Sequence, residues 1–303
     1  ADFNNDGKTD VAITSTNQVW VILGNGSGIY TGGTFHNVGS NPRSITTNDF
    51  NGDGKIDIAV ANSSSGDVSI LRNTGASFAP TVNYSVGSNL LSIATNDFNN
   101  DGSPDLAVGE GYYSNSGRVW ILSGSTTGTF SIANSFGIGG QPDKLVLSDI
   151  NNDGSLDILT KNSENVSVSI GSINGTFSMA TNYPVPFGGP AKTFDCADFN
   201  NDGKIDIAVG VSSSIFFITG NGNGTFYSPI SYQTALSHSP EAICTADFNN
   251  DTFKDLAIAN DYNDISLLLG SSAGTFTPTT TSYTVGSLPV DIKNADFNND
   301  GKM

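Results

Sequence analysis

Seven short segments of this chain place oxygen-bearing side chains at alternate positions, in the pattern Asp-x-Asn-x-Asp-Gly-x-x-Asp. Positions 1, 3, 5 and 9 offer side-chain oxygens, position 7 offers a backbone carbonyl, and the glycine at position 6 allows a sharp turn. This arrangement corresponds to the first three quarters of a calcium-binding loop. Because the ligands are hard oxygens without histidine or cysteine, the pattern favours Ca²⁺ over zinc or copper.

The seven segments, called motif loops below, give the predicted metal ligands. They are Asp2, Asn4, Asp6, Lys8 and Asp10; Asp49, Asn51, Asp53, Lys55 and Asp57; Asp97, Asn99, Asp101, Ser103 and Asp105; Asp149, Asn151, Asp153, Ser155 and Asp157; Asp198, Asn200, Asp202, Lys204 and Asp206; Asp247, Asn249, Asp251, Phe253 and Asp255; and Asp296, Asn298 and Asp300. Two carboxylates ~4 Å apart repel by ~4 kcal/mol at an effective dielectric of ~20, so such loops need a cation. The alternative is a solvated turn, which Asn, Asp and Gly also favour.

The last two motif loops depart from the pattern. Thr252 replaces the glycine of the sixth loop, where a positive φ would strain the turn, so we expect this loop to bind metal most weakly. The seventh loop lacks position 9 in this chain.

The residues between the loops predict the elements that hold them. In the second repeat, short half-apolar or apolar runs at 43–48, 58–61, 68–72 and 82–84 are separated by Gly, Ser and Asn turns. Position 12 of the loop is Val60, at which a strand is already expected, so the predicted site is strand-loop-strand. Later in most repeats comes Gly-Thr-Phe, whose phenylalanine, including Phe35, we expect to pack between sheets.

The motif loops recur every 47 to 52 residues. A repeat of this length with four antiparallel strands and no helical periodicity predicts an all-β fold, a β-propeller of four-stranded blades. We expect one domain over 1–303, with seven blades of which the last is truncated, as part of a longer chain. In the alternative, six blades form and residues 289–297 complete the first one.

Bulk composition excludes some functions. The net charge is -17, with 29 acidic residues, which argues against a nucleic-acid partner. No apolar run reaches the ~20 residues of a membrane-spanning helix, so direct membrane insertion is not expected. Cys196 lies two residues before the first aspartate of its motif, and Cys244 lies three residues before its own. Because side chains alternate along a strand, the two should point to opposite faces of equivalent strands, so we expect two separate small thiols rather than a disulfide.

These motifs resemble the FG-GAP/VCBS repeat family, whose repeats also form the propellers of integrin α-subunits. The resemblance covers the whole chain through Asp-x-Asn-x-Asp-Gly-x-x-Asp, the following Ile-Ala-Val and the later Gly-x-Gly-Thr-Phe. It implies a β-propeller with calcium between the first and second strands of each blade. It also implies a secreted or cell-surface recognition protein, one module of a larger chain.

The sequence favours a binding module over an enzyme, because no nucleophile or nucleotide-binding motif is present. Loops at the end opposite the motif loops vary between repeats, and variable loops on a fixed scaffold commonly carry recognition. The candidate ligand-binding residues there are Arg43, Tyr112 and Tyr113. We expect a protein or glycan partner and a role in cell adhesion. A polysaccharide-active enzyme, or its accessory propeller, and a structural spacer in a surface appendage are the alternatives.

Overall fold

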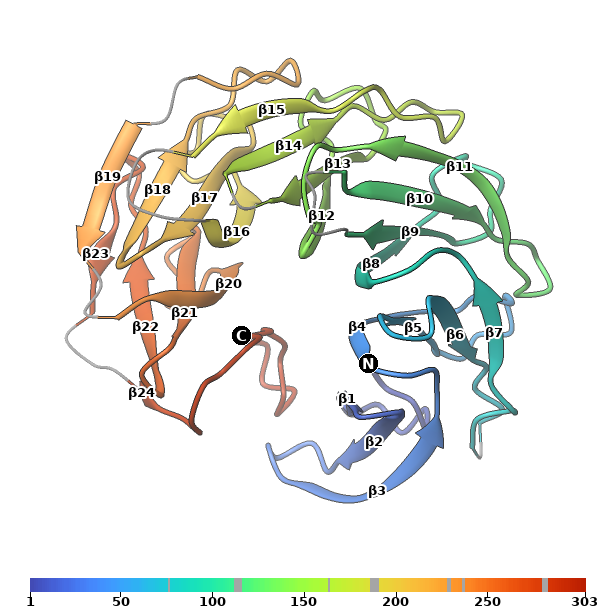
Figure 1. Cartoon of the computed structure of the whole chain (residues 1–303). Helices are drawn as coiled ribbons and strands as arrows, with labels where there is room; N and C mark the ends of the chain where they lie inside the picture. Colours follow the sequence, from blue (N-terminus) through green and yellow to red (C-terminus); the bar gives the residue numbers. More distant parts are fainter. Residues whose placement is uncertain are drawn as a thin grey trace. The chain divides into compact units, whose positions relative to one another are not determined.

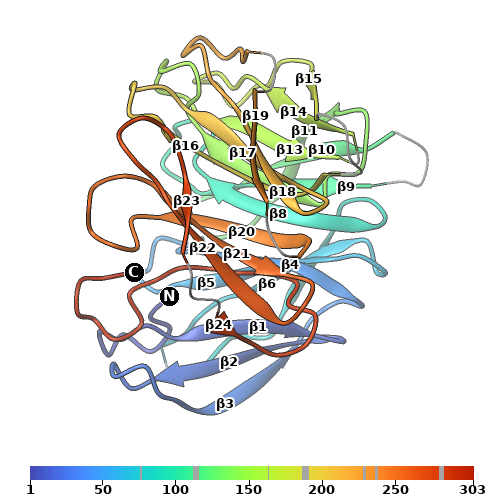
Figure 2. The same cartoon turned by 90° about the vertical axis from the view of Figure 1, so that its left-hand side faces the viewer.

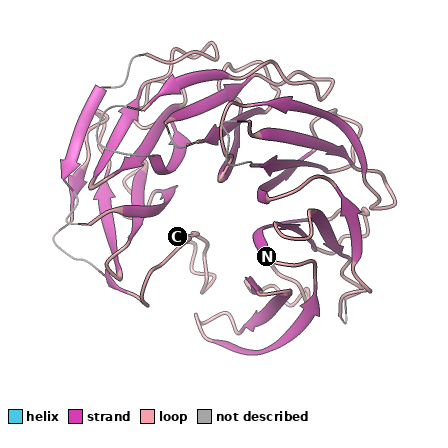
Figure 3. Ribbon diagram, viewed as in Figure 1, coloured by secondary structure: helices cyan, strands magenta, loops and turns pink. Residues whose placement is uncertain are grey.

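The computed structural model describes residues 1–75, 77–111, 116–162, 164–185, 191–227, 230–235, 238–279 and 283–303. All regular secondary structure in these ranges is β-strand, as Figure 3 shows. Within them, no helix is long and apolar enough to cross a membrane. The all-β prediction is therefore confirmed.

The strands form six sheets in which neighbours in the chain pair with one another (Figure 1). The first sheet contains β1 (Val11–Ser15), β2 (Gln18–Gly24) and β3 (Tyr30–Asn37). The second contains β4 (Pro42–Asn48), β5 (Asp57–Asn62), β6 (Asp67–Leu71) and β7 (Val82–Ser85), and the third contains β8 (Leu90–Asn96), β9 (Asp105–Glu110), β10 (Arg118–Ser123) and β11 (Ser131–Gly137). Each sheet is one repeat, and each motif loop joins its first two strands where both are present.

The remaining sheets repeat this plan. The fourth contains β12 (Lys144–Ser148), β13 (Asp157–Lys161), β14 (Asn165–Ser169) and β15 (Thr181–Pro184), and the fifth contains β16 (Ala191–Ala197), β17 (Asp206–Val211), β18 (Ser214–Ile218) and β19 (Ile230–Ala235). The sixth contains β20 (Pro240–Ala246), β21 (Asp255–Asn260), β22 (Asp264–Leu269), β23 (Thr277–Pro278) and β24 (Tyr283–Thr284). The predicted strand-loop-strand repeat is therefore confirmed.

Contacts between residues group the chain into two compact units. The first unit is Ala1–Leu145 with Gly171–Ala180 and Asp296–Gly301, and it holds the first three sheets. The second is Val146–Ile170 with Thr181–Ala295 and Lys302–Met303, and it holds the fifth and sixth sheets and β13 to β15. Each unit is described below by itself.

The core of the first unit lies between successive sheets. Strand β5 is buried along its whole length because its side chains alternate between two neighbours. Val60 packs with Val19 and Val21 of the first sheet, whereas Ala59 packs toward the third sheet. Figure 2 shows β1, β2 and β3 side by side as the sheet on one flank of this core.

An aromatic ring joins each repeat to the motif loop before it. Phe78 meets Phe3 with ring centroids 5.9 Å apart, and Phe130 meets Phe50 at 5.4 Å. In the first repeat this place belongs to Tyr30, whose ring meets Phe297 at 6.2 Å. The prediction that Phe35 packs between sheets is wrong, because the turn of this repeat is built differently and Phe35 lies within β3, 57% exposed.

The blade count also differs from the prediction. Six sheets form, so the seven-bladed arrangement favoured by the sequence is not supported. The segment 289–297 forms no strand, and it adds none to the three-stranded first sheet, so this detail of the six-blade alternative is wrong.

The two cysteines behave as expected. Cys244 is buried and Cys196 is half-buried, and neither forms a disulfide. They lie on β20 and β16, the first strands of the sixth and fifth sheets.

Candidate metal loops and the opposite loop end

The motif loops are tight turns that need left-handed backbone conformations at two positions. In the first loop, Asn5 at position 4 has φ 57° and Gly7 at position 6 has φ 79°. Only glycine adopts this region freely, while asparagine tolerates it better than other residues. The loop sequence is therefore set locally by turn chemistry.

Side-chain oxygens of the second loop converge on its backbone. Asp53 N donates to Asp49 Oδ1 at 3.1 Å and to Asn51 Oδ1 at 3.0 Å. Gly54 N donates to Asp49 Oδ2 at 2.7 Å, and Lys55 N donates to Asp53 Oδ1 at 3.0 Å. The oxygens of positions 1 and 3 thus meet at one amide nitrogen.

All seven loops share this hydrogen-bond pattern. The N–H of position 5 donates to positions 1 and 3, and the N–H of position 6 donates to position 1, at Asp2, Asp49, Asp97, Asp149, Asp198, Asp247 and Asp296. The truncated seventh loop is therefore folded like the others. The predicted ligands at positions 1, 3 and 5 are brought together within each loop.

The carboxylate at position 9 has a different environment. Asp57 is fully buried, and it accepts hydrogen bonds from Phe50 N at 3.1 Å and from Asn73 N at 2.7 Å. It therefore ties the start of the loop to the end of β6. The same pair of backbone donors recurs at Asp10, Asp105, Asp206 and Asp255.

The sequence analysis did not identify the second donor, the backbone N–H that follows the motif loop by more than ten residues. It is a glycine in four repeats, as at Gly24, where an added Cβ would lie 2.1 Å from Thr9 O. In the second repeat it is Asn73, whose Nδ2 donates to Phe3 O at 2.7 Å. A glycine at the end of the third expected strand, 14 to 19 residues after position 9, is the signal that could have revealed this contact.

The pKa shifts differ between the buried aspartates at position 9 and the exposed aspartate at position 5. Burial raises the pKa of Asp57 and Asp105, and it raises the pKa of Asp206 to about 6, although two backbone donors oppose the shift in each case. By contrast, the hydrogen bond from the Lys55 side chain lowers the pKa of exposed Asp53. Hydrogen bonding to the charged form and desolvation act in opposite directions.

The donor chemistry decides which positions fit a metal. Positions 1, 3 and 5 present carboxylate and amide oxygens, which suit a hard divalent cation. The position 9 carboxylate of Asp57 accepts two N–H bonds, one at each oxygen. In the described ranges, no group of three or more His, Cys, Asp and Glu side chains is arranged to hold a metal ion. The oxygens of positions 1 and 3 also accept backbone N–H bonds, and a carboxylate oxygen with one such bond keeps a second lone pair, so the donor chemistry of positions 1, 3, 5 and 9 fits a hard cation.

The sixth loop carries the expected strain. Thr252 has φ 78°, within the left-handed region, and its N–H still donates to Asp247 Oδ2 at 2.8 Å. A β-branched residue is costly in this conformation, by roughly 1–2 kcal/mol. The loop keeps its shape because the hydrogen bonds of the pattern are retained.

The seventh loop packs against the first loop. Thr9 Oγ1 donates to Asp296 O at 3.0 Å, and Asn299 Nδ2 donates to Gly7 O at 2.6 Å. With the contact between Phe297 and Tyr30, these bonds hold residues 296–301 in the first unit. The two ends of the sequence thus meet at this loop pair.

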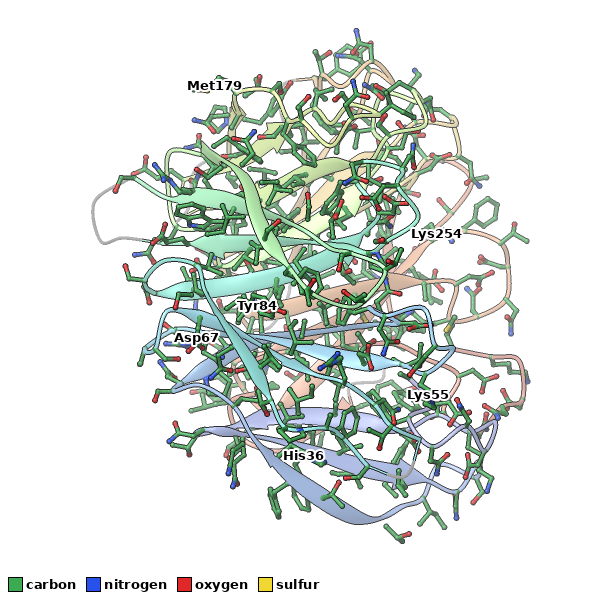
Figure 4. The ribbon with its side chains drawn as sticks, turned by 90° about the vertical axis from the view of Figure 1, so that its right-hand side faces the viewer. His36, Lys55, Asp67, Tyr84, Met179 and Lys254 are labelled. Carbon is green, nitrogen blue, oxygen red and sulfur yellow. The ribbon has the colours of Figure 1, made fainter. Side chains whose placement is uncertain are left out.

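The other end of the first unit is also built of hydrogen-bonded loops. Figure 4 shows Lys55, in the second motif loop, and Asp67, at the start of β6, at opposite ends of the second sheet. Around Asp67, Ser63 N donates to Asn41 O at 2.9 Å, and Asn89 N donates to Ser63 O at 3.0 Å. Each turn is thereby tied to the connections beside it.

The predicted ligand-binding residues map onto this second end in part. Arg43 is exposed near the start of β4, where the pairing with β5 shifts register between Pro42 and Ser44. This β-bulge places Arg43 at the end away from the second motif loop. Tyr112 and Tyr113 lie outside the described residues.

Known proteins define the class. The FG-GAP-like repeat family matches residues 2–60, 49–108, 97–160, 149–209, 198–258 and 247–303. The chain therefore belongs to the FG-GAP-like repeat family. No curated protein matches it.

Solved structures support the same fold. One concerns an Agrocybe aegerita lectin and its specific recognition of non-reducing terminal N-acetylglucosamine; it is 19% identical, has a TM-score of 0.66, and the match covers 94% of this chain and 78% of that chain. Another is BBS1N in complex with ARL6DN, at 15% identity and a TM-score of 0.65, with 96% and 82% covered. At these identities the likeness shows the fold alone, a β-propeller.

Proposed function

We propose that this protein is a calcium-stabilised recognition module that binds a protein or a glycan through the loop end opposite the motif loops. The observation that carries the proposal is the contrast between the two ends. Seven motif loops share one hydrogen-bond pattern, whereas the opposite loops differ in sequence from repeat to repeat. A constant end suits a structural ion, and a varied end on a fixed scaffold suits recognition.

Calcium would be held by the side chains at positions 1, 3 and 5 and the carbonyl at position 7. In the second loop these are Asp49, Asn51, Asp53 and Lys55, with Asp57 bracing the loop from inside. Such an ion would neutralise carboxylates that otherwise repel one another. A requirement for millimolar calcium would place the protein in an extracellular or cell-surface setting, where calcium is abundant.

Two observations support recognition as the role of the opposite end. Its turns are fixed by backbone hydrogen bonds, such as that from Ser63 N to Asn41 O, so a binding surface there would be preorganised. Related propellers also include a lectin that recognises N-acetylglucosamine and a domain that binds ARL6. Protein and glycan ligands are both compatible with such a surface.

A thermal melt in ~1 mM Ca²⁺ and in excess EDTA tests the calcium part. With a Kd of ~10 µM, each site would add ~2.7 kcal/mol to the free energy of unfolding, so five good sites would shift the melting temperature by tens of degrees. Mg²⁺ at the same concentration is the control for ionic strength. An unchanged melt would contradict a structural role for calcium.

A binding screen on glycan and surface-protein arrays tests the recognition part. For any ligand found, the triple variant Arg43→Ala, Tyr112→Ala and Tyr113→Ala is expected to lose affinity about tenfold or more. Lys55→Ala, in a motif loop, is the matched control and should bind normally in calcium. Binding that survives the triple variant unchanged would exclude the face proposed here.

A further inference from the structure

Five asparagines of this chain are followed directly by glycine. They are Asn25, Asn51, Asn174, Asn221 and Asn223. A glycine has no Cβ, so its backbone nitrogen can approach the side-chain carbonyl carbon of the asparagine before it. Attack at that carbon closes a cyclic imide and releases ammonia, which changes the chain covalently. Each pair is therefore a candidate site of self-modification.

Among the motif loops, only the second contains such a pair. Gly52 stands at position 4 of this loop, with φ 71°. The other six loops carry asparagine at position 4, with φ between 56° and 60°, at Asn5, Asn100, Asn152, Asn201, Asn250 and Asn299. The same left-handed turn accepts either residue, so the shape of the loop does not require glycine here.

The side chain of Asn51 folds back over the peptide that follows it. Its Oδ1 accepts a hydrogen bond from Asp53 N at 3.0 Å, and its Nδ2 donates to Asp53 Oδ2 at 3.3 Å. These bonds turn the side-chain carbonyl toward the following backbone, which is the side from which Gly52 N would attack. Proximity and orientation of this kind lower the barrier to reaction between two groups.

The Gly52 peptide also has room to rotate. Asn51 is half-buried and Gly52 is exposed. Within the first unit, no described atom other than those of its chain neighbours lies within 4 Å of the place that a Cβ on Gly52 would occupy. At the four other glycines that follow asparagine, such a Cβ would lie 2.7 to 3.2 Å from a neighbouring atom, as at Gly26, Gly175, Gly222 and Gly224. Packing therefore holds those four peptides, whereas the Gly52 peptide can turn into the geometry of attack.

We propose that Asn51 is a site of spontaneous deamidation, at which the second motif loop changes its own covalent structure with time. Gly52 N forms a bond to Asn51 Cγ while the bond from Cγ to Nδ2 breaks, and Nδ2 leaves as ammonia with the proton of Gly52 N. Water then opens the imide at either of its two carbonyls. One opening gives aspartate, and the other gives isoaspartate, in which the former side chain carries the main chain.

Either product changes the second loop. Aspartate adds a negative charge beside Asp49 and Asp53 and removes the Nδ2 donor to Asp53. Isoaspartate lengthens the main chain between positions 3 and 4, which alters the turn that depends on the bond from Asp53 N to Asn51 Oδ1. The reaction needs neither calcium nor a ligand, so this proposal does not depend on the proposed recognition function.

Peptide mapping by mass spectrometry, after incubation of the full chain in EDTA at mildly alkaline pH, tests the proposal. Trypsin cleaves after Arg43 and Lys55, and fragmentation of the peptide 44–55 assigns a mass gain of about 1 Da to Asn51 rather than to Asn48. In the folded chain, Asn51 should deamidate at least about tenfold faster than the four other asparagines that precede glycine. In urea this difference should disappear, because packing no longer holds the other glycines.

The matched variant is Gly52→Asn, which gives the second loop the Asn-Asn pair of the other six loops. It should slow deamidation of Asn51 at least about tenfold, because a side chain now hinders attack by the backbone nitrogen. A rate that survives Gly52→Asn would reject Gly52 N as the nucleophile. An Asn51 that reacts no faster than the other four in folded wild type would reject the site, and this comparison needs no variant to fold.

Discussion

The aspartates of one motif divide into two groups with opposite surroundings. Asp53 is exposed, lies beside Lys55 and has a lowered pKa, whereas Asp57, four residues later, is fully buried with a raised pKa. The outer aspartates shape the motif loop through hydrogen bonds to its backbone, and they are the proposed cation ligands. The inner aspartate joins that loop to the sheet. The same residue type thus has two opposite environments within nine residues.

The largest expected effect in metal-free protein comes from the inner aspartate. Asp57→Asn keeps one acceptor but points an N–H₂ group at a backbone donor, so either Phe50 N or Asn73 N loses its partner. A buried donor without an acceptor costs about 1–3 kcal/mol, and we expect a loss of about 2 kcal/mol in the free energy of unfolding. Urea unfolding in EDTA measures it.

The matched control is Asp53→Asn in the same loop. Its exposed carboxylate is paired with Lys55, so the loss in EDTA should stay below about 0.5 kcal/mol. In calcium the control should instead lose much of the stabilisation that the ion provides. Equal losses for both variants in EDTA would remove the distinction between inner and outer aspartates.

The next effect concerns the strained sixth loop. Thr252→Gly should raise the free energy of unfolding by about 1 kcal/mol, because glycine adopts φ 78° without steric cost. It should also tighten calcium binding by this loop. Thr252→Ala is the control, since alanine keeps the Cβ and should bring little gain. A gain as large from alanine would show that strain is not the cause.

Acidification should reveal the raised pKa of a buried position 9 aspartate through the pH dependence of stability. Burial raises the folded-state pKa of Asp206 to about 6, above the usual 3.8 of an aspartate, so folding favours its protonated form. Its contribution to stability therefore grows as pH falls from 7 toward 4, and is lost as pH rises through about 6. In EDTA, the stability difference between wild type and Asp206→Asn should widen in favour of wild type on acidification. A constant difference would contradict the raised pKa.

The smallest effect is expected at the surface pair. The amine of Lys55 lies 3.1 Å from Asp53 Oδ2, and both side chains are solvent-accessible. Lys55→Ala should change stability in EDTA by less than about 0.5 kcal/mol, and any change should vanish in high salt. A loss of 1 kcal/mol or more would mean that the outer loop contributes to folding without metal.

Much of the fold could be predicted because it is local and repeated. The strands expected at 43–48, 58–61, 68–72 and 82–84 are found as β4 to β7, with boundaries within one residue. The strain at Thr252 was also foreseen, since loop shape follows from turn chemistry. Periodicity strengthens such predictions because each repeat tests the same pattern again.

Other features escaped because they depend on distant contacts. One of the two bonds that brace position 9 depends on such a contact, because Asp57 accepts from Asn73 N, sixteen residues later in the chain. Tyr30 takes the place expected for Phe35, because the strand pairing of β2 and β3, rather than the Gly-Thr-Phe pattern, decides which ring meets the motif loop.

The sequence by itself determined the repeat, the all-β class and the seven loops of oxygen ligands. These follow from spacing, turn residues and alternation, which act over a few residues. Only the tertiary structure decided that six sheets form and that the inner aspartates brace the loops. Burial and pairing depend on what lies beside a residue in space, which the pattern of a repeat does not state.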